Sequence, residues 1–178
     1  TSAIHICTAM IGFRVTRANK PRNRLFALTF FGLAWICTSL GLAKAGFGEL
    51  FPPLVVAAPL LSGYCMASYS LFCETVVFPK QRPNYWVFAL GGFGTLYAIT
   101  VLLVPDGTLY VHEFIQGRRV DMDFRIVAPF AMHSLALIVL MVRAVSVLYH
   151  GSRISQDTHQ RTARKLLMTG NYVFIGMF

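Results

Sequence analysis

The sequence predicts an all-α fold, a polytopic bundle of transmembrane helices. Hydrophobic residues make up 56% of the 178 residues, and the mean hydropathy is +0.59. Long apolar runs alternate with short polar stretches, and several runs approach the roughly 20 residues that a helix needs to cross the hydrocarbon core. Most of the 16 Lys and Arg residues lie in the polar stretches between these runs. Together these features are typical of an integral membrane protein.

The apolar runs define the predicted spans in order along the chain. Four runs are complete spans, at residues 25–42, 50–73, 85–104 and 126–148. Two shorter runs, 1–13 and 166–178, reach the ends of the sequence while still apolar, so we expect each to be part of a longer span. The chain is therefore expected to be one fragment of a transmembrane bundle, without an effector domain.

The distribution of cations predicts the orientation. Basic loops resist translocation, so the 14–24 stretch, which holds five cations and no acid, is expected in the cytoplasm. Alternation of the spans then places twelve Lys and Arg residues inside and four outside. We predict a bacterial inner-membrane protein whose N-terminus lies outside.

The net charge of +9 and the pI near 9.8 have two interpretations. In a soluble protein they would favour binding to nucleic acid. Here the cations flank membrane spans, so they are better explained by topology and by attraction to anionic lipid. No nucleic-acid partner is expected.

The long polar loop at 105–125 contains two alternating stretches around Gln116 and Gly117. Alternation on both sides of a glycine turn predicts an extracytoplasmic β-hairpin. An irregular loop is the alternative.

Polar side chains within the spans suggest a ligand pocket. Tyr64 and Ser68 share one helix face, and His133 is an ionisable group inside a complete span, which is a candidate functional position by default. With Tyr97 they would line a pocket in the outer half of the bundle, capped by the 105–125 loop and suited to an amphipathic or lipid-like ligand. The alternatives are ordinary helix packing and a neutral histidine bonded to a neighbouring helix.

No cofactor, metal site or catalytic residue is predicted. The four cysteines lie in apolar runs without metal-ligand spacing, and no nucleophile or paired-carboxylate motif is present. A haem held by His5 and His133 would require facing histidines in two helices, and no repeated histidine pattern supports it.

The basic segment before the last run is expected to transmit a signal. Residues 156–165 are polar and lack Gly and Pro, so the flanking helices can extend into the cytoplasm. Arg161, Arg164 and Lys165 are the predicted signal-coupling residues, by a helix shift that reaches an effector. The alternative is a solvated loop that only fixes topology.

Several segments together resemble a known family. They are the 23–43 run after a basic loop, the Pro-rich FPPLVVAAPLLSGY at 51–64, the VPDG at 104–107 and the basic HQRTARKLLMTG at 159–170. In this order they resemble the N-terminal seven-helix sensor region of bacterial membrane signalling proteins, found before histidine kinases and related effectors. The resemblance implies an outside N-terminus, a ligand pocket in the outer half and a cytoplasmic effector after a seventh span. Neither that span nor an effector lies in this sequence.

The resulting expectation is a membrane sensor that couples an extracytoplasmic or lipid-like ligand to a cytoplasmic effector. The alternatives are a non-catalytic accessory subunit of a larger membrane complex and a fragment of a transporter or channel. The expected partners are the lipid bilayer and either a small amphipathic ligand or neighbouring membrane subunits, and a homodimer stays open.

Overall fold

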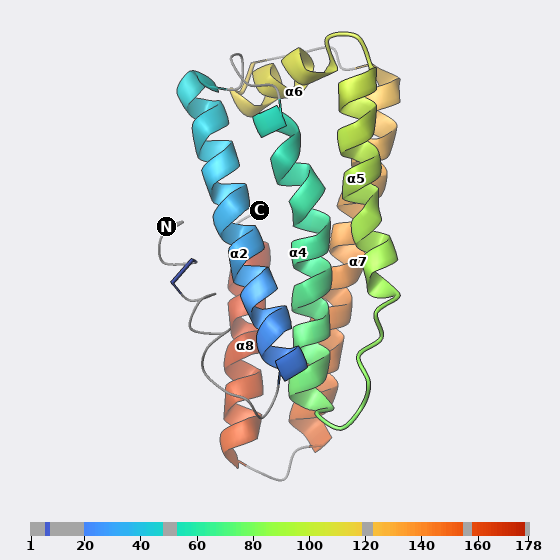
Figure 1. The fold of residues 1–178 in the computed structure, drawn as a ribbon. Helices are drawn as coiled ribbons and strands as arrows, with labels where there is room; N and C mark the ends of the chain where they lie inside the picture. Colours follow the sequence, from blue (N-terminus) through green and yellow to red (C-terminus); the bar gives the residue numbers. More distant parts are fainter. Residues whose placement is uncertain (1–5, 8–19, 48–52, 119–122, 155–157, 177–178) are drawn as a thin grey trace.

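The protein is a bundle of long helices in a computed structural model that describes residues 6–7, 20–47, 53–118, 123–154 and 158–176 (Figure 1). The long helices are α2 (Lys20–Leu42), α4 (Pro53–Val77), α5 (Val87–Leu103), α7 (Phe124–Ile154) and α8 (Thr158–Gly176). A short π-helical segment, η2 (Ala43–Phe47), continues α2, and a short helix, α6 (Gly107–Ile115), follows α5. All regular structure in the described residues is helical.

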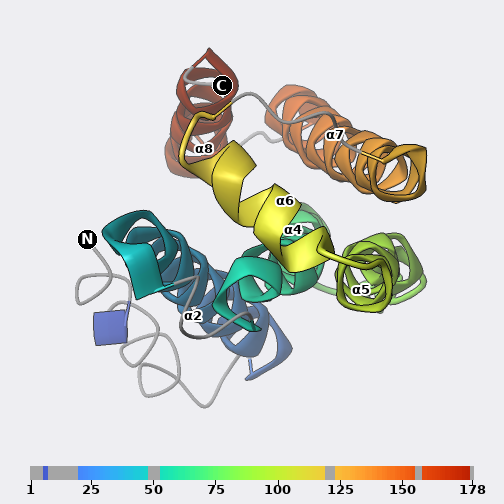
Figure 2. The same ribbon diagram turned by 90° about the horizontal axis from the view of Figure 1, so that it is seen from above.

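Helix α4 is the centre of the bundle, since α2, α5 and α7 all pack against it, while α8 packs against α7. Helix α6 lies across one end of the bundle, above α4 in the end-on view (Figure 2). We call this the α6 end. At the opposite end, the basic end, α4 and α7 terminate and α8 begins (Figure 1).

Three helices are long and apolar enough to cross a membrane: Arg22–Phe47, Val56–Val77 and Phe124–Ile154. Helix α5 is shorter, and it is bent by 114° from α6 at the break between them. If this bent pair counts as one span, the number rises to four. These three to four apolar helices fit an integral membrane protein.

Two layers of buried apolar side chains bracket the bundle. Near the basic end, α2, α4, α5 and α7 all contribute to a shared cluster, which we call the boundary layer: Leu25, Ala67, Leu71, Val87 and Leu140. Near the α6 end, a second cluster includes Val56, Val101, Val111 and Ile126. Along α7 the two layers are separated by about 21 Å at a rise of 1.5 Å per residue, so both fit within a hydrocarbon core about 30 Å thick.

Glycines allow α4 and α5 to approach at backbone distance. A Cβ atom on Gly63 would lie 2.3 Å from the carbonyl oxygen of Gly91, and one on Gly94 would lie 2.3 Å from that of Pro59. Small residues at such interfaces give membrane helices the close contact that the hydrophobic effect cannot provide in lipid. This pair of helices therefore tolerates no side chain at these positions without moving apart.

The predicted β-hairpin is wrong in its first arm, because residues 107–115 form α6. Gly107 makes the sharp bend possible, since a Cβ there would lie 2.3 Å from the carbonyl oxygen of Val101. Val111 and His112 are buried against the bundle. Their burial favours an amphipathic helix over an alternating strand in this segment. Residues 119–122 of the second arm lie outside the described residues, and α7 begins at Phe124.

At the basic end, α4, α7 and α8 extend beyond the apolar runs of the predicted spans, and for α7 and α8 a helical extension into the polar segment was predicted. Helices α4 and α7 continue to Val77 and Ile154, beyond the predicted ends of their spans at 73 and 148. Helix α8 begins at Thr158, well before the predicted run at 166–178. Of the predicted run at 1–13, only residues 6 and 7 are described. The extensions reach past the boundary layer, so α4, α7 and α8 can pack together there.

Candidate functional site

His133 forms a buried polar contact between α7 and α4. Its side chain is 3% exposed, and its Nε2 lies 2.9 Å from the hydroxyl of Ser62. That hydroxyl also lies 3.0 Å from the carbonyl oxygen of Pro59. A hydroxyl has one proton, so both contacts are satisfied when Ser62 donates to Pro59 and accepts from a protonated Nε2. Nδ1 of His133 is then an acceptor, buried and without a hydrogen-bond partner among the described residues.

Tyr97 and His133, two of the four predicted ligand-binding residues, lie together. Their rings are stacked, with centroids 6.3 Å apart and planes 8° from parallel. Gly94 lies beside the imidazole, since a Cβ there would be 3.3 Å from Nδ1. Tyr97 is itself buried. The pair forms a compact contact between α5 and α7 in the half of the bundle nearer the α6 end.

An aromatic chain joins this contact to α6. The ring of Phe130 lies 5.4 Å from that of Tyr97 and 6.5 Å from that of Phe114 on α6, measured between centroids. Phe114 and Phe130 are exposed on the bundle surface, whereas Tyr97 is buried. Three ring contacts therefore connect Phe114 on α6 to His133 on α7.

The other two predicted ligand-binding residues have different surroundings. The hydroxyl of Tyr64 lies 3.0 Å from that of Thr95, so it links α4 to α5. Ser68 is buried on α4. A surface cavity of about 380 Å³ lies at the α6 end, and it is lined by Lys44, Ile115, Gln116 and Gly117. None of the four predicted residues lines that cavity, and ligand binding by them stays a prediction.

An ion pair that the sequence interpretation missed joins α4 and α7 just beyond the boundary layer. Arg143 donates to Glu74 Oε2 at 2.7 Å and to the hydroxyl of Ser70 at 2.8 Å. The exposed fractions of the two charged side chains are 22% and 14%. The charge count had placed Arg143 on the cytoplasmic side, at the end of the predicted span at 126–148, and it lies inside α7. A partly buried pair of this kind holds two helices in one register, and losing either partner leaves an uncompensated charge.

Arg164, one of the predicted signal-coupling residues, is buried, which the sequence did not predict. It is 7% exposed, and it donates to the carbonyl oxygen of Gly151 at 2.6 Å and to that of Val76 at 3.5 Å. Both carbonyls belong to the last turns of their helices, where no intrahelical donor is available. Arg164 of α8 therefore caps the C-terminal ends of α4 and α7 together, and a cation there also suits the helix dipoles.

The other two predicted signal-coupling residues differ from Arg164. Arg161 and Lys165 are exposed on α8. Leu167 and Met168 instead pack on a buried cluster formed by Cys73, Val77, Ala144 and Leu148. Arg164, Leu167 and Met168 lie on one face of α8, at spacing i, i+3 and i+4. This spacing was the signal in the sequence that could have indicated the buried face of α8.

The contacts between α4 and α7 form a line along the bundle, which we call the α4–α7 polar line. It runs from Ser62 and His133 through Glu74 and Arg143 to the Val76 and Gly151 carbonyls that Arg164 caps. Such an arrangement can fix, or release, the relative position of two helices.

The alternative of a haem held by His5 and His133, which the sequence did not support, is not tested here, because His5 lies outside the described residues. Comparison of the chain with protein-family models, with curated proteins and with solved structures finds no match.

Proposed function

We propose that this chain is the membrane-embedded part of a sensor, which couples an extracytoplasmic or lipid-like ligand to a cytoplasmic effector. In this proposal the α6 end faces outside and the basic end faces the cytoplasm, as the bias of cations suggests. The ligand acts at the α6 end, and α8 delivers the change. No catalytic role is proposed for the chain.

The α4–α7 polar line is the observation that carries this proposal. Helix pairs in lipid need few polar contacts to associate, and charged groups within or beside spans are costly enough to indicate a role. Here the same two helices are joined by polar contacts in their interior, at Ser62 and His133, and toward the basic end, where the last contact includes α8. A sliding or rotation of α7 against α4 would therefore change how α8 is held.

The ligand is proposed to act on the contact between His133, Tyr97 and Ser62. The aromatic chain from Phe114 gives a route from the outer surface, and the exposed rings suit an acyl chain or another amphipathic group. Tyr64 and Ser68 belong to the neighbouring turns of α4 and would form the floor of the site. We expect an amphipathic ligand and not a strongly charged one, because the charged side chains among the described residues lie toward the two ends of the bundle.

Pulsed electron paramagnetic resonance can test the proposal without a known ligand. Spin labels at His150 and Ala163, both exposed, would report the distance between α7 and α8 in lipid bilayers after Cys7 and Cys37 are replaced. Substitution of His133 by Leu perturbs the far end of the polar line. We expect the α7–α8 distance to change by about 1 to 2 Å, the usual size of helix shifts in signalling.

The matched control is Leu135→Val, at nearly the same depth on α7 but exposed to lipid. It should leave the distance unchanged. An accessory subunit has no need to carry a change along α7, so an unaltered distance in both variants would favour that alternative.

A further inference from the structure

The segment between α4 and α5, residues 78–86, combines charge and exposed aromatic rings. Lys80 and Arg82 are exposed, and neither forms an ion pair with an acid among the described residues. Tyr85 and Trp86 are 54% and 56% exposed. The sequence of this segment, FPKQRPNYW, contains no acid.

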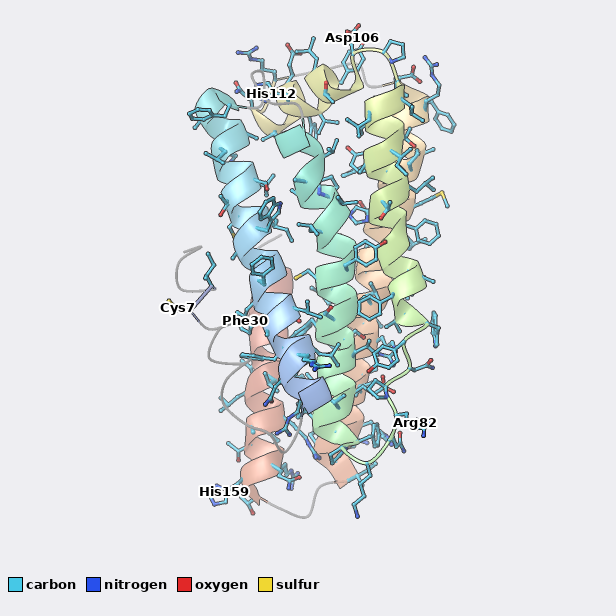
Figure 3. All side chains as sticks on the ribbon, viewed as in Figure 1. Cys7, Phe30, Arg82, Asp106, His112 and His159 are labelled. Carbon is cyan, nitrogen blue, oxygen red and sulfur yellow. The ribbon has the colours of Figure 1, made fainter. Side chains whose placement is uncertain are left out.

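The depth of this segment follows from the packing of its neighbours. Val87, the residue after Trp86, belongs to the boundary layer. Trp86 therefore lies directly before the apolar helix α5, and the ends of membrane spans are where tryptophan and tyrosine prefer to be. Lys80 and Arg82 lie in the loop between α4 and α5, and Figure 3 shows Arg82 toward the basic end.

Other cations surround the bundle at the same end. They come from α2, α7 and α8 and are all exposed: Arg24, Arg153, Arg161 and Lys165. Glu74 is the acid of this region among the described residues, and Arg143 already neutralises it. The guanidinium of Arg153 lies 4.7 Å above the ring of Tyr149, which repeats the pairing of a cation with an interfacial aromatic ring. The described basic end is therefore positively charged around its circumference.

We propose that the 78–86 segment binds the headgroups of anionic phospholipids, with Lys80 and Arg82 contacting the phosphates and Trp86 lying at the level of the glycerol groups. Positive charge flanking a span attracts anionic lipid, and the effect is confined to about a Debye length from the surface. Exposed aromatic rings beside the cations suit a lipid at an interface better than a soluble acidic protein. This inference is independent of the proposed sensor role and of the sidedness of the chain.

Quenching by brominated lipids tests the inference at this position, because the chain has two tryptophans, Trp35 and Trp86. In a Trp35→Phe protein, the fluorescence reports lipids beside Trp86. The protein would be reconstituted with mixtures of brominated and ordinary phosphatidylglycerol or phosphatidylcholine. We expect the anionic lipid to bind beside Trp86 about fivefold more strongly than the zwitterionic lipid at low salt.

Two controls locate the effect. The combined substitution Lys80→Gln and Arg82→Gln should remove the preference, whereas Lys44→Gln at the α6 end should leave it intact. In a Trp86→Phe protein, Trp35 lies exposed within α2, away from the headgroups, and should not distinguish the two lipids.

Equal quenching of Trp86 by both lipids would overturn the proposal, as would a preference that survives loss of both cations. The proposal would also be overturned if the protein with Lys80 and Arg82 intact shows no lipid preference but binds an acidic protein that the double variant does not bind. That result would assign the segment to a protein partner.

Discussion

Removing the guanidinium of Arg164 should free α8 from the rest of the bundle. In Arg164→Met the side chain keeps a similar length but cannot donate. The bond to the Gly151 carbonyl is short, at 2.6 Å, whereas the bond to Val76 is at the distance limit and Gln160 lies on the same helix. We therefore attribute the loss to one hydrogen bond from a charged donor, which contributes about 2 to 3 kcal/mol when the acceptor stays buried.

This free energy corresponds to a factor of about 30 to 150 in the opening equilibrium of α8. In bilayers, the amides of residues 158–169 should therefore exchange hydrogen faster in Arg164→Met than in the unaltered protein, as measured by mass spectrometry. Arg161→Met, one turn earlier and exposed, is the matched control and should change protection by less than about 0.5 kcal/mol. Equal protection in the two variants would refute the capping role of Arg164.

Three further predictions concern packing, pH and sidedness. Gly63→Ala should lower the free energy of unfolding by about 1 to 3 kcal/mol, because its Cβ meets the backbone of α5, whereas Gly92→Ala meets nothing within 4 Å and should be neutral or stabilising. Asp123 accepts hydrogen bonds from the side chain and the backbone N–H of Arg125, and these bonds hold the pKa of the Asp123 carboxyl below its ordinary value of 3.8. The carboxylate therefore stabilises the start of α7 above that pH, and exchange protection there should fall as the pH drops through the lowered pKa but not in Asp123→Asn. In intact cells or right-side-out vesicles, an impermeant thiol reagent should label Gln116→Cys and spare Arg82→Cys in a cysteine-free background; the opposite pattern would reverse the proposed orientation.

The fold class could be predicted from the sequence because apolar length and charge position have strong physical requirements in lipid. The loop at 105–125 was misread since alternation over seven residues fits a short amphipathic helix as well as a strand. Tertiary contacts decide between the helix and the strand. Val111 and His112 are buried against the end of the bundle, and Gly107 lies close to the backbone of Val101.

The site was predictable only in part. His133 was identifiable as an ionisable group inside an apolar run, and Tyr97 was predicted to line the same pocket, but their stacked contact was not predicted. The ion pair of Arg143 with Glu74 was not predicted, because the sequence alone does not show which faces of α4 and α7 meet. The burial of Arg164, beside the exposed Arg161, depends on how α8 packs and had only the spacing of Leu167 and Met168 to indicate it.

A double-mutant cycle tests most directly the claim that the α4–α7 polar line couples the two ends of the bundle. His133→Leu and Arg164→Met alter sites separated along α7 by about 27 Å, since Gly151, the partner of Arg164, lies 18 residues after His133. Effects of independent substitutions at such a distance add to within about 0.5 kcal/mol. Measured as free energies of α8 opening in bilayers, the two should instead deviate from additivity by about 1 to 3 kcal/mol, the usual range for coupled sites. Additive effects would contradict the coupling on which the proposed function depends.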